Sequence, residues 1–153
     1  MFNDQRPNPA GATYFFTVSL FQENSTLLVD EVDALFSAIE ATAKTLPFYM
    51  DAWVVMPDHM HAVWTMPPGD DGHAQRWVQI KRRFTSALAP EKRNCGRVWQ
   101  RGVAFHQVAG LIDYSDAIRR CWFDPVRHEM ARVPEDWKFS SAHLEDEKVK
   151  LVA

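Results

Sequence analysis

Two histidines, His59 and His61, are the first candidates in this chain for residues that do chemistry. A single methionine separates them. In a β-strand, the side chains of residues i and i+2 point to the same face, so the two imidazoles would project together. Two imidazoles on one face can converge on a metal ion or on a phosphate. For such a pair taken alone, a solvated strand face is the more frequent interpretation. The interpretation as a metal or phosphate site therefore needs support from other residues of the chain.

Basic residues are concentrated in one segment. Residues 1–75 carry a net charge of −8 and residues 76–101 a net charge of +7, although the whole chain carries −3. Because charges act over about 8 Å at physiological salt, the local charge decides whether a phosphate backbone is attracted. A solvated helix face followed by a loop is the alternative interpretation. The residues that we expect to contact nucleic acid are Arg76, Lys81, Arg82, Arg83, Arg97 and Arg101.

The whole chain has the size and composition of one globular domain. Its 153 residues are 46% hydrophobic and 24% charged, which is typical of a chain that buries its own core. We expect a single domain over residues 1–153, with flexible ends at residues 1–12 and about 145–153. Two cysteines do not form a disulfide framework, so a reducing cytoplasm is expected. No stretch approaches about 18 apolar residues, so we expect no membrane span.

The pattern of apolar residues predicts an alternation of strands and helices. The expected strands are residues 13–21, 48–56, 59–66 and 98–108. The expected helices are one capped by Asp30 and ended before Pro47, one around residues 77–88 that ends before Pro90, and one from residue 116 to about 123 that is capped by Ser115. The order βαββαβ with an extra helix predicts a ferredoxin-like α+β fold, an antiparallel sheet with helices on one face and an additional C-terminal helix.

A longer motif surrounds the histidines. The segment MPDHMH at residues 56–61, preceded by DAWVV at residues 51–55, resembles the histidine–hydrophobe–histidine (HUH) signature of the single-tyrosine transposases. Its form is typical of the REP-associated tyrosine transposases. The resemblance to this family extends over most of the chain and includes residues 11–18, 64–70, 76–84, 98–106, 124–128 and 136–141.

The resemblance implies an activity, a cofactor and a partner. Members of the family cleave and rejoin single-stranded or hairpin DNA through a 5′-phosphotyrosine, in DNA transposition and recombination. In them, two histidines and a helix-borne amide hold a divalent ion, Mg²⁺ or Mn²⁺, on the scissile phosphate. Here the corresponding residues are His59, His61 and Asp124, with a carboxylate in place of the amide. A cytoplasmic, nucleoid-associated location is implied, and both monomers and homodimers occur among relatives.

The chain departs from the family at the nucleophile. The tyrosine is expected four residues before the metal ligand, and Arg120 stands there. Arginine stays protonated at any working pH and cannot attack a phosphate. The nearest tyrosine, Tyr114, lies six residues further back and would face away on a regular helix. His106 matches a family histidine and is an accessory candidate.

Three functions remain open on the sequence. The first is an active transposase that cleaves through a covalent adduct. The second is a catalytically inactive relative that keeps the fold and binds hairpin DNA. The third is a metal-dependent phosphodiesterase that uses water on the same histidine and aspartate residues. An adduct, binding without cleavage, and cleavage without an adduct would distinguish them.

Overall fold

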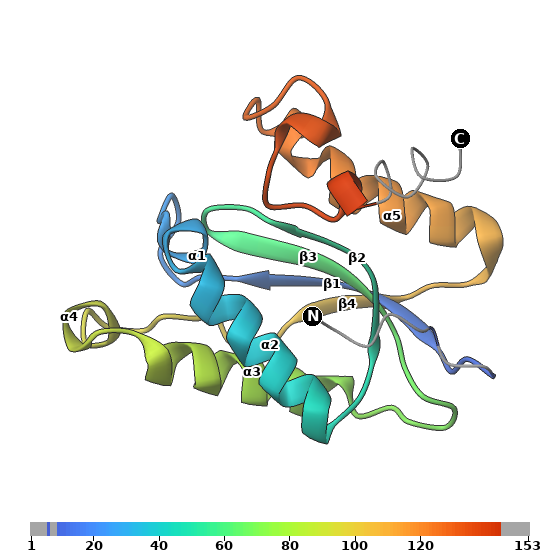
Figure 1. Ribbon diagram of the computed structural model, residues 1–153, viewed down its shortest axis with the longest axis horizontal. Helices are drawn as coiled ribbons and strands as arrows, with labels where there is room; N and C mark the ends of the chain where they lie inside the picture. Colours follow the sequence, from blue (N-terminus) through green and yellow to red (C-terminus); the bar gives the residue numbers. More distant parts are fainter. Residues whose placement is uncertain (1–5, 7–8, 145–153) are drawn as a thin grey trace.

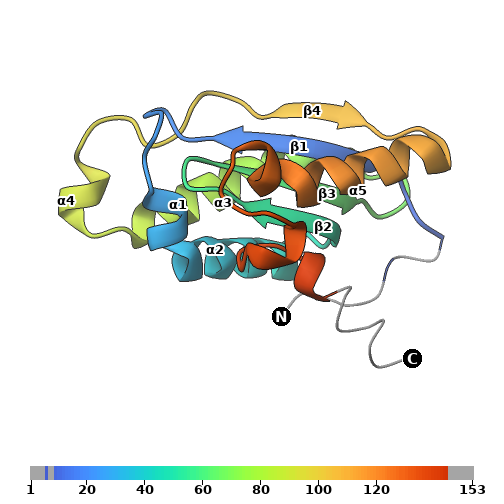
Figure 2. The ribbon, with the colours of Figure 1, turned by 90° about the horizontal axis from the view of Figure 1, so that it is seen from above.

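A computed structural model describes residue 6 and residues 9–144 of the chain. Its centre is a four-stranded sheet made of β1 (Thr13–Ser19), β2 (Tyr49–Val55), β3 (His59–Thr65) and β4 (Ala104–Gln107). The strands lie in the order β2-β3-β1-β4, and every neighbouring pair is antiparallel (Figure 2). The ferredoxin-like α+β fold is confirmed.

Helices cover both faces of this sheet. The helices α2 (Val32–Thr45) and α3 (His73–Ala87) pack side by side on one face, whereas α5 (Gly110–Arg127) crosses the other (Figure 1). The expected pair of helices on one face is therefore present, and the additional helix lies opposite to it. Three short elements connect these parts, namely α1 (Leu27–Asp30), α4 (Pro90–Arg93) and the 3₁₀ turn η1 (Pro134–Asp136).

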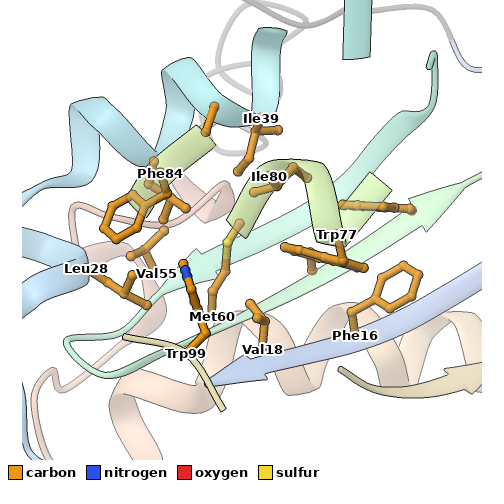
Figure 3. Packing of buried hydrophobic residues seen from close by; sticks show 14 of the residues in the cluster. Phe16, Val18, Leu28, Ile39, Val55, Met60, Trp77, Ile80, Phe84 and Trp99 are labelled. Atoms are coloured by element: carbon orange, nitrogen blue, oxygen red, sulfur yellow. The ribbon is translucent and has the colours of Figure 1, made fainter. Parts of the chain in front are cut away.

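The main core lies between the sheet and the α2/α3 pair. On α3, Trp77, Ile80 and Phe84 recur at spacings of three and four and are all buried, as an amphipathic helix requires. Figure 3 shows Trp77 beside Phe16 and Ile80 above Met60, whereas Phe84 packs against Trp99 in the same cluster. This core fixes the sheet and so fixes the strand that carries the two histidines.

Several element boundaries differ from the expectation. Asp30 does not cap α2, because it ends α1 and the N-cap of α2 is Glu31. β1 ends at Ser19 and α3 begins at His73. The last helix begins at Gly110, before the expected cap at Ser115, because Asp113 accepts a hydrogen bond from the Ala109 N–H at 2.8 Å. It also continues through Pro125 to its end. The fourth strand is shorter than expected, because Gly102 takes a φ of +69° and separates it from the isolated bridge between Leu20 and Trp99.

Two segments outside the named strands pair with the sheet. Residues 1–5, 7–8 and 145–153, where most of the expected flexibility falls, lie outside the described residues. Gly11 and Ala12 exchange hydrogen bonds with Met66, so paired backbone begins before β1. Residues 139–141 run along the edge of β2, with a bridge between Val54 and Ser140. Within the described residues, no helix is long and apolar enough to cross a membrane.

Candidate functional site

His59 and His61 lie at the start of β3, beside the end of β1. Met56 and His59 close the turn before the strand through a backbone hydrogen bond of 2.8 Å. The Nδ1 atom of His59 donates to the Asp58 carboxylate at 2.7 Å, and Thr17 Oγ1 lies 2.8 Å from Nδ1 of His61. Both rings are therefore held by Nδ1, which leaves the two Nε2 atoms to face α5.

Asp124 of α5 meets both histidines with one carboxylate oxygen. Its Oδ2 atom lies 2.7 Å from Nε2 of His59 and 3.1 Å from Nε2 of His61. Asp124 is only 4% exposed. Burial raises the pKa of this carboxyl, but the hydrogen bonds to His59 and His61 outweigh it and hold the pKa well below the usual range. Asp124 is therefore a buried carboxylate anion.

The electrostatics of His59 follow from the same contacts. Burial lowers the pKa of this imidazole, but hydrogen bonds to Asp124 and Asp58 have the larger combined effect and raise it. A carboxylate lies against each ring nitrogen, Asp58 at Nδ1 and Asp124 at Nε2, both at 2.7 Å. These contacts favour the protonated ring, and Nε2 is the nitrogen that faces Asp124.

The second oxygen of Asp124 faces two further side chains that the sequence did not single out. Arg127 Nη2 donates to Asp124 Oδ1 at 3.0 Å, and Nε2 of His128 lies 3.6 Å from the same atom. Ligand atoms of His59, Asp124 and His128 all lie within 4.8 Å of one another. The spacing of four residues between Asp124 and His128 on a helix could have indicated this neighbour.

None of the three tyrosines lies beside this cluster. Tyr114 donates its hydroxyl to Asp51 Oδ1 at 2.7 Å, and burial together with this bond raises its pKa. Ten residues separate it from Asp124, which is about 15 Å along a helix. Tyr14 packs against His73 on the α3 side, and Tyr49 pairs with the far end of β3.

Arg120, at the position expected for the nucleophile, contacts a ring that packs on His61. Its guanidinium carbon is 4.6 Å from the centre of the Phe15 ring. The Phe15 ring in turn stacks on His61 at 5.3 Å between centroids. The residue that the sequence identified as out of place is thus part of the surroundings of the site.

The basic segment divides into buried and exposed residues. Arg76 was expected to contact nucleic acid, but it is 2% exposed and donates to Asp70 and to the carbonyls of Leu46 and Pro47. Its guanidinium is already satisfied and is not available to a phosphate. Lys81 donates to two carbonyls, those of Gln100 and Gly102. The exposed members are Arg82, Arg83, Arg97 and Arg101.

The structure does not bring Arg82 and Arg83 to the histidine cluster. Arg82 and Arg83 belong to α3, which covers the face of the sheet opposite to α5. His106, the accessory candidate, is exposed on β4 and lies 2.9 Å from Asp113 at the start of α5. It holds the strand to the helix and is separate from the cluster around Asp124.

Fold and site together define a ferredoxin-like domain in which paired histidines on the sheet meet a carboxylate on a crossing helix. No protein-family model matches the chain. It is 38% identical to the REP-associated tyrosine transposase of Escherichia coli K12 over 135 residues, which cover 87% of this chain and 78% of that protein. A Haemophilus influenzae protein assigned by name to the same group is 30% identical over 152 residues, 94% of this chain and 86% of that protein.

A solved structure gives the same result. The structure of a REP-associated tyrosine transposase bound to a REP hairpin superposes with a TM-score of 0.79 and 34% identity, covering 94% of this chain and 84% of that one. This chain belongs to the REP-associated tyrosine transposase family. The family predicted from the sequence is confirmed.

Proposed function

We propose that this chain binds single-stranded or hairpin DNA at the cluster formed by His59, His61 and Asp124. The observation that carries the proposal is the convergence of both histidines on Asp124, in a family with a member whose structure holds a REP hairpin. Phosphates of DNA are anions, and imidazolium and guanidinium groups are the side chains that pair with them. As a DNA-binding protein, it would act in the cytoplasm, at the nucleoid.

We propose that the same cluster holds a divalent metal ion. The residues that would hold it are His59, His61 and Asp124, with His128 as a further candidate. Imidazole nitrogen and carboxylate oxygen suit Mn²⁺ better than Mg²⁺, which prefers oxygen. When bound, such an ion polarises a phosphoryl oxygen as a Lewis acid. Asp58 and Thr17 already orient the rings through Nδ1, as outer partners of metal-binding histidines do.

We further propose that DNA binding here proceeds without a phosphotyrosine. The support is that Tyr114 is engaged by Asp51 and lies about 15 Å along the helix from Asp124. Arg120 stays protonated and has no oxygen with which to attack. The second of the three functions left open by the sequence, binding with the covalent step lost, therefore has the best support.

The test uses a labelled hairpin oligonucleotide with a single-stranded extension and the full-length protein. Fluorescence anisotropy in Mn²⁺ should show saturable binding that weakens in the double variant His59→Ala, His61→Ala. A denaturing gel of the same mixture should show no covalent protein–DNA band. His143→Ala is the matched control, because Nε2 of His143 donates to the Trp137 carbonyl at 2.7 Å and His143 makes no other hydrogen bond within the described residues.

Each other outcome identifies a different function. An adduct that disappears in Tyr114→Phe would make Tyr114 the nucleophile. Cleaved DNA without an adduct would indicate attack by water. Absence of any hairpin binding by the unmodified protein would reject the proposal.

A further inference from the structure

Strand β1 provides a platform beside the histidine cluster. Its residues Phe15 and Thr17 are two positions apart, so their side chains share the face that meets α5. Thr17 Oγ1 is hydrogen-bonded to Nδ1 of His61, and the Phe15 ring stacks on the same imidazole. Phe15 is only 4% exposed, so its ring is fixed in place. The platform therefore has a defined position relative to His61.

Arg120 extends from α5 over this platform. It lies three residues after the buried Ala117 and four before Asp124, which places it along the sheet-facing side of the helix. Its guanidinium carbon sits 4.6 Å from the centre of the Phe15 ring, within the range of a cation–π contact. Yet Arg120 as a residue is exposed to solvent. One side of the guanidinium is thus supported, while the group stays accessible.

Arg120 differs from Arg127 in its acidic partners within the described residues. Among residue 6 and residues 9–144, no carboxylate forms an ion pair with its guanidinium, whereas Arg127 pairs with Asp124 at 3.0 Å. Arginine carries five N–H donors in a planar fork. Within the described residues, the guanidinium of Arg120 over Phe15 therefore has no acidic partner, whereas that of Arg127 has one.

We propose that Arg120 binds a phosphate of the DNA strand next to the histidine cluster and anchors that strand without a covalent bond. The inference rests on the proposed DNA-binding function and specifies one contact of it. A guanidinium matches two oxygens of a phosphate at once, and stacking on Phe15 reduces the rotamer freedom that binding must remove. Arg120 stands where the nucleophilic tyrosine is expected. It would then hold the strand by its permanent positive charge and not by a phosphotyrosine bond.

The test measures hairpin binding by fluorescence anisotropy over a range of salt concentrations. Arg120→Gln should lower the affinity roughly tenfold. The slope of log affinity against log salt should also fall by about one, because one phosphate contact is lost. Arg119→Gln is the matched control, since Arg119 is an exposed neighbour on the same helix and makes no contact with the cluster within the described residues. It should change the affinity less than twofold.

A second variant separates charge from geometry. Arg120→Lys keeps the charge and loses the fork, so it should keep the salt slope and regain only part of the affinity. Thermal melting should show that all three variants fold.

The outcomes distinguish the two proposals. Equal affinities and slopes for Arg120→Gln and Arg119→Gln, with hairpin binding by the unmodified protein intact, would overturn the role of Arg120 alone. No binding by the unmodified protein would remove both proposals.

Discussion

The two faces of the sheet differ in what they bury. Against α2 and α3, the sheet buries a large apolar cluster in which Trp64 and Trp77 stack at 4.5 Å between ring centroids. Against α5 it buries a smaller apolar cluster together with two carboxylates, Asp51 and Asp124. Strand β3 serves both, because Met60 and Trp64 join the large cluster whereas His61 joins the α5 side.

The α2/α3 face therefore mainly stabilises the fold, whereas the α5 face carries the groups that could do chemistry. Apolar area contributes roughly 25 cal/mol per Å² whichever side chains supply it, so the α2/α3 face can stabilise the fold without specific polar partners. Buried charges are favourable only when each is paired, and the α5 face pairs Asp124 with imidazole and guanidinium groups. Substitutions on the two faces should therefore affect different measurements.

The largest effect on stability is expected on the α2/α3 face. Trp77→Ala should lower the free energy of unfolding by about 3–5 kcal/mol, because a large, 2% exposed side chain leaves a cavity. Urea unfolding measures this change. The control is Val78→Ala on the same helix, where Val78 is 53% exposed and the change should stay within about 0.5 kcal/mol. Similar losses in both variants would contradict a core centred on Trp77.

The α5 face should show its largest effect in metal binding. Asp124→Ala should weaken Mn²⁺ binding by more than roughly 100-fold, and His128→Ala by roughly 10-fold. Titration calorimetry measures both, with His106→Ala as the control because His106 pairs with Asp113 away from the cluster. Undiminished Mn²⁺ binding by Asp124→Ala would show that the carboxylate is not a ligand.

The free energy of unfolding is expected to depend on pH through the buried Arg76 of α3 and its partner Asp70. The hydrogen bond from Arg76 is the main reason why the pKa of Asp70 lies below its ordinary value. A carboxyl with a lowered folded-state pKa stabilises the protein above its unfolded pKa of about 4, and this stabilisation is lost as the pH falls through the folded value. Asp70→Asn should therefore cost about 1–2 kcal/mol near pH 7 and much less near about pH 3.

Urea unfolding at the two pH values tests this expectation. Asp71→Asn is the control, because Asp71 is an exposed neighbour that forms no ion pair within the described residues. A cost of Asp70→Asn that is the same at both pH values would mean that the ionised carboxylate does not hold Arg76.

The smallest effect is expected at Tyr114. Tyr114→Phe removes the hydroxyl bonded to Asp51, but Thr65 still donates to Asp51 at 2.7 Å. The free energy of unfolding should fall by about 1 kcal/mol, and hairpin affinity should stay unchanged. Tyr49→Phe, in the neighbouring strand, is the control for loss of a phenol. A hairpin affinity that falls in Tyr114→Phe alone would connect Tyr114 to the DNA site.

Much of the fold and part of the site follow from local patterns. The two-residue spacing of His59 and His61 places them on one face of any strand, so their common orientation could be predicted without a partner. The spacing of Trp77, Ile80 and Phe84 likewise indicates, from the sequence alone, which side of α3 is buried. The end of the last helix could not be predicted in this way, because Pro125 usually marks a boundary and here lies inside α5.

The remaining features depend on contacts between distant segments. Arg76 belongs to a basic run, but the end of α2 and the following Pro47 present carbonyls to it, and the loop supplies Asp70. Its burial therefore depends on how α2 packs beside α3. In the same way, 65 residues separate His59 from Asp124, and only the crossing of α5 over the sheet brings them to 2.7 Å. The sequence alone determined which groups could form a site, since residue type and short spacing act locally. The tertiary structure decided which of them meet, because that depends on the packing of helices against opposite faces of one sheet.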